Sequence, residues 1–232
     1  MTSKKDSGTK KSVVFWDIKQ GSDEWLALRK CFLTASDFAT ILGWNPYKTM
    51  EEHMRELYSG NPVHKPNKRQ VQAMQWGTTH EDEAIFEYGL LKFGMDEDTW
   101  PMTHPGIVVD YNGKLAASPD RFVGEDGIVE AKCPFSRCFY KDDIPLHHKA
   151  QLLGLLGITG RQYVDYVCWI PQGGIKIRRM DFTDELKHEW FVAKDILESY
   201  VTLHEDAYKP HRALVLEPND DEDEEDGFRR SL

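Results

Sequence analysis

The order of the expected secondary-structure elements predicts an α/β or α+β protein built around a mixed central β-sheet. Helical periodicity dominates the chain up to residue 93, and short apolar runs broken by proline and glycine follow over residues 99–140. A helix, two strands and a last helix complete the pattern. Hydrophobic residues make up 40% of the 232 residues, which is enough to bury a core. We therefore expect a single globular domain over residues 13–210.

The first half of the chain is expected to be mainly helical. Apolar spacing, polar N-capping residues and stops at glycine delimit its helices. The expected helices are residues 22–30 with Ser22 as N-cap, the short FATIL segment capped by Ser36, residues 49–60 ending at Gly60, and residues 69–93. The proline-containing segment 61–67 connects the last two.

The second half is expected to supply the strands. The runs GIVVD, KLAAS, RFVG and GIVEAK have the composition of short strands separated by tight turns. A buried helix is expected over residues 146–158, followed by the strands QYVDYVCWI and GIKIRRMDF, which the turn PQGG joins. The final helix is expected over residues 183–207 with Thr183 as N-cap. This order favours a mixed sheet flanked by helices.

The charge of the chain is concentrated near its C-terminal end. The net charge is −10, and residues 217–226 (EPNDDEDEED) hold eight acids and no base. Without this segment the net charge is −2, so the rest of the chain can form a local basic groove. Residues 1–12 and the acidic tail 211–232 are expected to be disordered. We favour a solubility role for the tail over one that imitates DNA phosphate.

Several features predict an intracellular protein that is not secreted and has no membrane partner. The N-terminal MTSKKDSGTKK lacks the apolar stretch of a secretory signal. No apolar run approaches the roughly 20 residues that a membrane helix needs. The four cysteines show no pairwise framework, which is typical of a reduced chain.

The stretch SPDRFVGEDGIVEAK, residues 118–132, carries the pattern most suggestive of chemistry. If it forms a hairpin that turns at its glycines, Asp120 and Glu130 lie at neighbouring strand ends and can reach one point. Side chains alternate along a strand, so Glu130 and Lys132 share one face while Ala131 points to the other. Two facing carboxylates repel each other unless a cation joins them or one is protonated. Mg²⁺ prefers such oxygen ligands, and the carbonyl of Ala131 could supply another.

The same charges have a plainer interpretation as a solvated ladder on an exposed strand. An acid two residues before a lysine occurs in many surface strands, so the spacing alone is weak. The Ser-Pro turn before Asp120 and the apolar residues between the charges favour a metal site. A lysine beside a metal and two carboxylates provides the groups needed for phosphodiester hydrolysis.

Four blocks of the sequence resemble, in order, those of a known family. They are QGSDEWLALRKCFLTASDFATIL, WGTTHEDEA, SPDRFVGEDGIVEAKCPF and HKAQLLGLLGI. Together they resemble the PD-(D/E)xK nucleases, and within them the lambda-exonuclease-like (YqaJ-type) viral recombinase family. The resemblance implies an α/β fold with a restriction-endonuclease-like core.

The resemblance also implies roles for individual residues. The catalytic residues would be Asp120, Glu130, Lys132, Gln151 and Glu81, with Asp120, Glu130 and the carbonyl of Ala131 as metal ligands. The terminal 5′-phosphate of DNA would be bound by Arg29, Ser36 and Ser118. Arginine offers a planar, bidentate phosphate clamp, and a serine hydroxyl adds a hydrogen bond.

The function implied is a Mg²⁺-dependent deoxyribonuclease that degrades linear double-stranded DNA from an end, 5′ to 3′, in recombination or end processing. Mn²⁺ could substitute for Mg²⁺. A single-strand annealing protein and a homotrimeric assembly would be partners by resemblance, and a viral enzyme would work in the host cytoplasm or nucleus. The alternatives are a structure-specific endonuclease or nickase on the same fold, and a non-catalytic DNA-mimic or DNA-binding protein.

Some residues keep a second interpretation or depart from the family pattern. Gln151 could satisfy buried backbone groups, Glu81 could lie on a solvated helix face, and Arg29 could pair with a neighbouring acid. His148, beside His147, is expected on the surface or in a DNA groove. Arg121 stands where the family usually keeps glycine after Ser-Pro-Asp. Cys31 and Leu153 are further departures.

Overall fold

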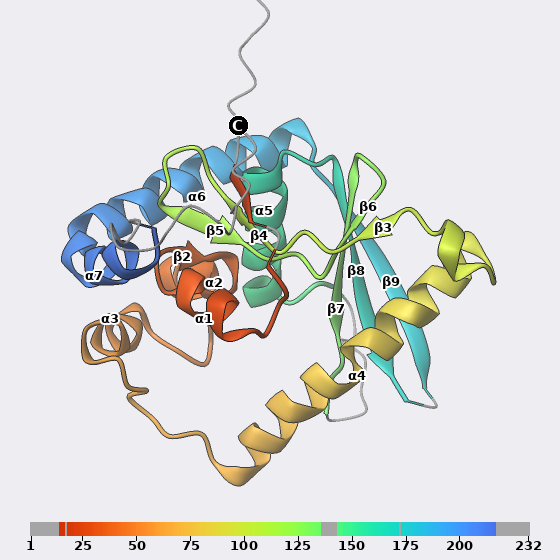
Figure 1. Ribbon diagram of the computed structural model, residues 1–232, viewed down its shortest axis with the longest axis horizontal. Helices are drawn as coiled ribbons and strands as arrows, with labels where there is room; N and C mark the ends of the chain where they lie inside the picture. The colour runs from red at the N-terminus through yellow and green to blue at the C-terminus, as the bar shows by residue number, and fades with distance from the viewer. Residues whose placement is uncertain (1–13, 17, 136–142, 172, 217–232) are drawn as a thin grey trace, which may run out of the picture.

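The computed structural model describes residues 14–16, 18–135, 143–171 and 173–216 (Figure 1). Its longer helices are α1 (Asp23–Arg29), α3 (Met50–Ser59), α4 (Lys68–Phe93), α5 (Leu146–Thr159), α6 (Asp184–Leu203) and α7 (Glu205–Leu216). The short helical elements are η1 (Ala35–Asp37), α2 (Phe38–Ile41) and η2 (Glu97–Thr99). None of the helices within these ranges is long and apolar enough to cross a membrane.

The strands of the described residues form two sheets. The first has the order β1-β4-β5-β2 and contains β1 (Val14–Trp16), β4 (Ile107–Val109), β5 (Leu115–Ala117) and β2 (Leu33–Thr34). The second has the order β3-β6-β7-β8-β9 and contains β3 (Met102–Thr103), β6 (Arg121–Val123), β7 (Gly127–Lys132), β8 (Tyr163–Ile170) and β9 (Gly174–Asp181). Both sheets are mixed, because β2 runs parallel to β5 and β7 runs parallel to β8 while the other pairs are antiparallel. The expected mixed α/β architecture is confirmed, although two sheets replace the single one expected.

The five-stranded sheet is covered on both faces. On one face Ile128 and Val164 pack with α5 in the largest hydrophobic cluster. On the other face Val129 and Ala131 pack against Ile85 and other residues of α4. The two sets alternate along β7, as the period of a strand requires. Glu130 and Lys132 therefore lie on the α5 face, which agrees with the alternation expected from the sequence.

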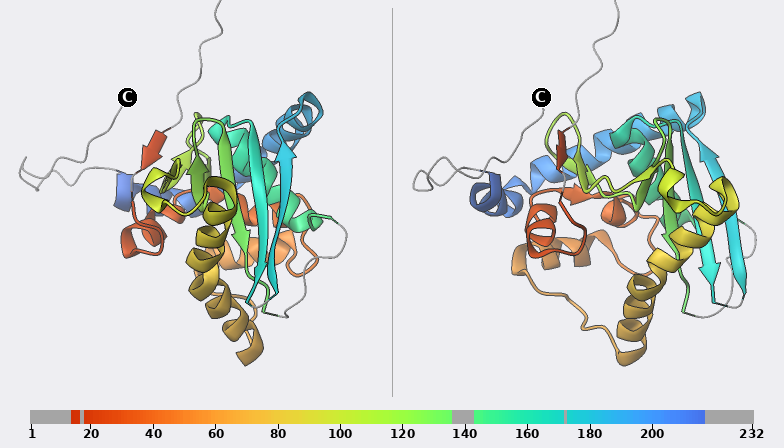
Figure 2. Two further views of the ribbon diagram at one scale, coloured as in Figure 1. Left: turned by 90° about the vertical axis from the view of Figure 1, so that its right-hand side faces the viewer. Right: turned by 45° about the vertical axis from the view of Figure 1, so that its right-hand side comes forward.

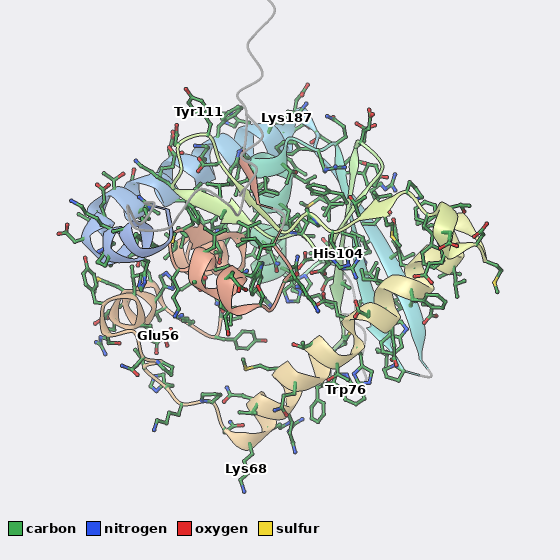
Figure 3. The ribbon with its side chains drawn as sticks, viewed as in Figure 1. Glu56, Lys68, Trp76, His104, Tyr111 and Lys187 are labelled. Carbon is green, nitrogen blue, oxygen red and sulfur yellow. The ribbon has the colours of Figure 1, made fainter. Side chains whose placement is uncertain are left out.

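Local sequence signals explain most of the helix boundaries. Thr49 and Glu52 form a capping box at the start of α3, and Gly60 ends this helix in a left-handed conformation with φ of 67°. Asn67 and Gln70 form a second capping box at the start of α4. The first turns of α4 project away from the sheets, with Lys68 at the free end (Figures 2 and 3). Only the second half of α4 contributes buried residues.

Two boundaries expected from the sequence are wrong. Ser36 does not cap the FATIL helix, because it lies inside η1 and Asp37 occupies the N-cap position of α2. The last helix ends at Leu203, and a separate helix, α7, continues to Leu216. The domain boundary expected at residue 210 therefore falls inside α7. Disorder was expected over residues 1–12 and 211–232. For residues 211–216 this expectation is wrong, because they form the last part of α7, whereas residues 1–12 and 217–232 lie outside the described residues.

Candidate active site

The β6–β7 hairpin brings the two predicted metal-binding carboxylates together. Arg121 and Val129 form the last residue pair between β6 and β7 at this end of the hairpin. Asp120 precedes β6 and Glu130 follows Val129, so the two acids lie next to each other where the pairing ends. The backbone N–H of Ala131 donates a hydrogen bond of 2.7 Å to Oδ2 of Asp120. Both carboxylates are buried, Asp120 with 7% and Glu130 with 2% of its surface exposed.

Glu130 is held by two of the other predicted catalytic residues, Lys132 and Gln151. Its Oε1 accepts hydrogen bonds from Nζ of Lys132 at 2.7 Å and from Nε2 of Gln151, on α5, at 2.6 Å. Gln151 therefore reaches the carboxylate across the helix–sheet interface rather than a buried backbone group. The other oxygen, Oε2, is buried and has no hydrogen-bond partner within the described structure. An unpartnered carboxylate oxygen in a buried site is costly unless something binds there.

The electrostatics of the site reflect three crowded acids. Burial, followed by the charges of Glu130 and Glu81, raises the pKa of Asp120 well above its ordinary value. Burial and Glu130 also raise the pKa of Glu81. Burial alone would lower the pKa of Lys132, but the surrounding carboxylates, Glu130 first, raise it instead. The site therefore favours bound positive charge, of which Lys132 supplies one unit.

The donor set fits a hard divalent cation. Two carboxylates face each other, and Oε2 of Glu130 is unpartnered. The N–H and C=O of one strand residue point to the same side, so the carbonyl of Ala131 faces the edge where its N–H meets Asp120. Within the described ranges, no three His, Cys, Asp or Glu side chains are already arranged as a metal site. Backbone oxygen and water would therefore have to complete the coordination.

Two of the three predicted phosphate-binding residues are in contact. Nη2 of Arg29 donates to Oγ of Ser36 at 2.9 Å and to Oγ1 of Thr34 at 3.2 Å. The guanidinium carbon of Arg29 also lies 4.4 Å from the centre of the Trp25 ring. Arg29 thus pairs with hydroxyls rather than with Asp23 or Glu24. Ser118 is half-buried two residues before Asp120, and in the described structure it forms no hydrogen bond with Arg29 or Ser36.

Comparisons with known proteins identify the family of this chain. Residues 24–162 match the YqaJ-like viral recombinase domain, which is more than half of the chain. The chain belongs to this family. It is 28% identical over 170 residues to a protein of Bacillus subtilis (strain 168) named "Uncharacterized protein YqaJ". That match covers 71% of this chain and 51% of the Bacillus protein, so the chain spans about half the length of this relative.

Solved structures share the fold of this YqaJ-like chain. The alkaline exonuclease LHK-Exo of Laribacter hongkongensis matches 84% of the chain and all of its own length, with a TM-score of 0.62 and 24% identity. LHK-Exo in complex with dAMP matches with a TM-score of 0.63, 22% identity and 98% of its length, again over 84% of this chain. A phage-related exonuclease of Haemophilus somnus 129PT matches 80% of the chain and 95% of its own length, with a TM-score of 0.55 and 15% identity.

Three contacts in this YqaJ-like site were not expected from the sequence. Thr34 joins the Arg29–Ser36 pair, although its place in the TAS block gave a signal for it. His148 is partly buried, and its Nδ1 lies 2.7 Å from the hydroxyl of the buried Tyr166. Arg121 turns back over the Ser-Pro-Asp turn, where its Nη1 donates to the carbonyl oxygen of Asp120 at 2.6 Å. The sequence carried no signal for the last two contacts.

Proposed function

We propose that this chain is a metal-dependent deoxyribonuclease that degrades linear double-stranded DNA from an end in the 5′ to 3′ direction. The observation that carries the proposal is the buried group of Asp120, Glu130 and Lys132, in which Oε2 of Glu130 lacks a partner. Membership of the YqaJ-like viral recombinase family and the fold shared with exonucleases support it.

Each residue of the group has a distinct task in this proposal. Asp120, Glu130 and the Ala131 carbonyl would hold Mg²⁺, or Mn²⁺ in its place, which would supply Lewis-acid stabilisation of the charge on the scissile phosphate. Lys132 donates to Glu130 and presents further N–H donors to a water or phosphate oxygen. Gln151 positions Glu130 through its amide. Glu81 is a third acid whose pKa responds to Glu130, which puts it within electrostatic reach of the group.

The direction of degradation would be set by a phosphate site beside the acids. Arg29 with the hydroxyls of Ser36 and Thr34 forms a donor group suited to a terminal 5′-phosphate. Burial lowers the pKa of Arg29, while Asp37 and then Glu130 act to raise it, so Arg29 lies within electrostatic reach of the catalytic acids. We assign Ser118 to the same phosphate on its position before Asp120. A strand end held here would place an adjoining phosphodiester at the acids.

The test is a digest of linear and closed-circular duplex DNA with Mg²⁺. The proposal predicts loss of the linear DNA only, and faster loss when its 5′ ends carry phosphate than when they carry hydroxyl. Arg29→Gln should remove that preference for phosphate, whereas Lys187→Gln, on α6, should keep it. Rapid loss of the circle would instead favour a structure-specific endonuclease or nickase. Binding without any hydrolysis would favour a DNA-binding protein, and no binding would contradict a DNA-related role.

The assembly and protein partners are part of the same proposal. A closed homotrimer would suit processive digestion, because a ring around duplex DNA dissociates slowly. A single-strand annealing protein would use the strand left behind. The mass of the protein in solution tests the first point, and a monomeric mass at working concentration would contradict it. Co-purification with an annealing protein expressed from the same source tests the second.

A further inference from the structure

We propose that Arg121 is a DNA-binding residue that exchanges its ion pair with Asp82 for a backbone phosphate next to the scissile one. The inference rests on the proposed function, because it adds a contact with the DNA strand at the same site. It concerns a position at which this chain departs from the glycine of the family pattern, so the contact would distinguish this chain from relatives that keep glycine there.

Arg121 is fixed at the edge of the catalytic group. Its Nη1 donates to the carbonyl oxygen of Asp120 at 2.6 Å, and its Nη2 donates to Oδ1 of Asp82 on α4 at 3.0 Å. The Arg121 side chain is 12% exposed, whereas that of Asp82 is 88% exposed. The partner is therefore a solvated surface carboxylate that a competing anion can displace, because such pairs contribute little. A phosphate accepts the same bidentate donation from a guanidinium.

A cavity beside this ion pair has the size and lining for part of a nucleotide strand. It has a volume of about 680 Å³, within the range of ligand sites, and Arg121, Asp82 and Glu81 lie along it. Lys19, Gln20, Trp25, Thr78 and His104 also line it. A second cavity, of about 510 Å³, is also lined by Asp82, Arg121 and His104, of which Figure 3 labels His104. Arg121 thus lies between two open spaces rather than in a packed core.

The larger cavity is lined by two cations, Arg121 and Lys19, and by two acids, Glu81 and Asp82, so an anionic ligand can bind near Arg121 once Asp82 turns away from it. Lys19 is exposed and adds a second cation, and Gln20 and Thr78 add neutral polar groups. Nε2 of Gln20 donates to the carbonyl of Pro119 at 2.9 Å, which attaches this loop to the Ser-Pro-Asp turn. The cavity wall and the catalytic turn are therefore held together. Trp25 offers an apolar face for a sugar or base on the same wall.

The position of Glu81 connects the cavity to the chemistry. Glu81 lines the cavity and is within electrostatic reach of Glu130, Lys132 and Arg121. A strand with one phosphate at the acids would have its next phosphate in the neighbourhood of this cavity. Without DNA, Asp82 forms an ion pair with the guanidinium and keeps Arg121 oriented. With DNA, Arg121 would contact the phosphate and Asp82 would turn to solvent.

The test compares two substitutions that should act in opposite directions. Binding of a 5′-phosphorylated linear duplex is measured over a salt series with Ca²⁺ in place of Mg²⁺, and the DNA is checked for integrity. Arg121→Gln should weaken binding about tenfold and lower the slope of log affinity against log salt by about 0.9. Asp82→Asn should tighten binding, because it frees Arg121. Lys187→Gln, which also removes one positive charge, should leave both quantities unchanged.

A structural role for the ion pair makes the opposite prediction. If the ion pair were only structural, Arg121→Gln and Asp82→Asn would both weaken DNA binding and lower thermal stability, and this result would overturn the proposal. An unchanged salt slope in Arg121→Gln would overturn it as well. Duplexes in which a single phosphate is replaced by a neutral methylphosphonate locate the contact. At one position this replacement should weaken DNA binding by the parent without further weakening DNA binding by Arg121→Gln. Hydrolysis by the parent chain is scored separately, so failure of the nuclease proposal is distinguishable from failure of this one.

Discussion

Two buried acidic centres lie on opposite faces of the β7–β8 pair, and they are built differently. On the α4 face, Asp165 is completely buried, and its two oxygens accept from the Tyr88 hydroxyl at 2.8 Å and from Arg179 at 2.8 and 2.9 Å. Burial would raise the pKa of Asp165, but the bonds from Arg179 and Tyr88 outweigh it and lower the pKa. On the α5 face, Glu130 keeps an unpartnered oxygen, and the pKa of Asp120 is raised.

The difference distinguishes a carboxylate that stabilises the fold from carboxylates that can bind a ligand. A buried carboxylate with every oxygen satisfied joins elements of the fold, here α4, β8 and β9. A pair of buried carboxylates that repel each other, with one oxygen of Glu130 unpartnered, keeps free capacity for a ligand. The charge of an acid and its burial do not distinguish the two cases. The hydrogen-bond partners do.

The largest effect is expected from the lysine of the α5-face centre. Lys132→Ala should lower the rate of nucleotide release from linear DNA by about 10³-fold, because it removes the donor beside the acids. The rate is measured as release of labelled nucleotide, with folding checked by circular dichroism. Lys132→Arg is the matched control and should keep the fold while losing most of the rate. A rate within about twofold of the parent would contradict the assignment.

The α4-face centre should govern stability instead. Asp165→Ala leaves the guanidinium of Arg179 and the hydroxyl of Tyr88 without their partner, so we expect a loss of about 3 kcal/mol in the free energy of unfolding. Urea denaturation measures this loss. The rate per folded molecule should change little. If the variant kept its stability but lost hydrolysis, the contrast between the two centres would be wrong.

At the α5-face centre, removal of an acid should increase stability, which is the opposite of the effect expected for Asp165. Asp120→Asn should raise the free energy of unfolding by about 1–2 kcal/mol at pH 7 without divalent ions, because it removes a repelling buried charge. The raised pKa means that native Asp120 binds its proton more tightly than the unfolded chain does. The gain should therefore shrink as the pH falls and the parent takes up that proton. Mg²⁺ should raise the melting temperature of the parent and not that of Asp120→Asn.

The smallest effect at pH 7 is expected at His148, which borders the same centre. Burial, and then the charge of Lys132, lowers its pKa to about 3. Between pH 6.5 and 3 the unfolded chain would bind a proton at this residue that the folded chain does not, so stability falls as the pH decreases. When the pH is lowered from 7 to 5, the free energy of unfolding of His148→Gln should therefore fall by about 1–2 kcal/mol less than that of the parent. Equal losses in the two proteins, measured by urea denaturation at each pH, would contradict the shift.

The sequence predicted those parts of the fold and site that depend on local patterns. Strand alternation placed Glu130 and Lys132 on one face, and the glycines of the hairpin placed Asp120 beside them. Capping residues and glycine stops located α3 and the start of α6. Ser36 failed as an N-cap because a turn of η1 precedes α2, and the hydroxyl of Ser36 contacts Arg29 instead.

The contacts that were missed join residues far apart in the sequence. Tyr88 and Asp165 are 77 positions apart, and Asp82 and Arg121 are 39 positions apart. A single charged residue in a strand or helix does not indicate which distant charge will face it. The architecture of the two mixed sheets must be known before such pairs can be named, and the layers were not readable from element order alone.

The parallel pairing of β7 with β8 has a consequence for folding. The β6–β7 hairpin is local, so the contact between Asp120 and Ala131 can form early. The bond from Gln151 to Glu130 needs α5 to cross over and dock while β8 pairs with β7, a slower and less local event. The centre is therefore completed late, so under the proposed function a partly folded chain would neither bind metal tightly nor cut DNA before α5 has docked.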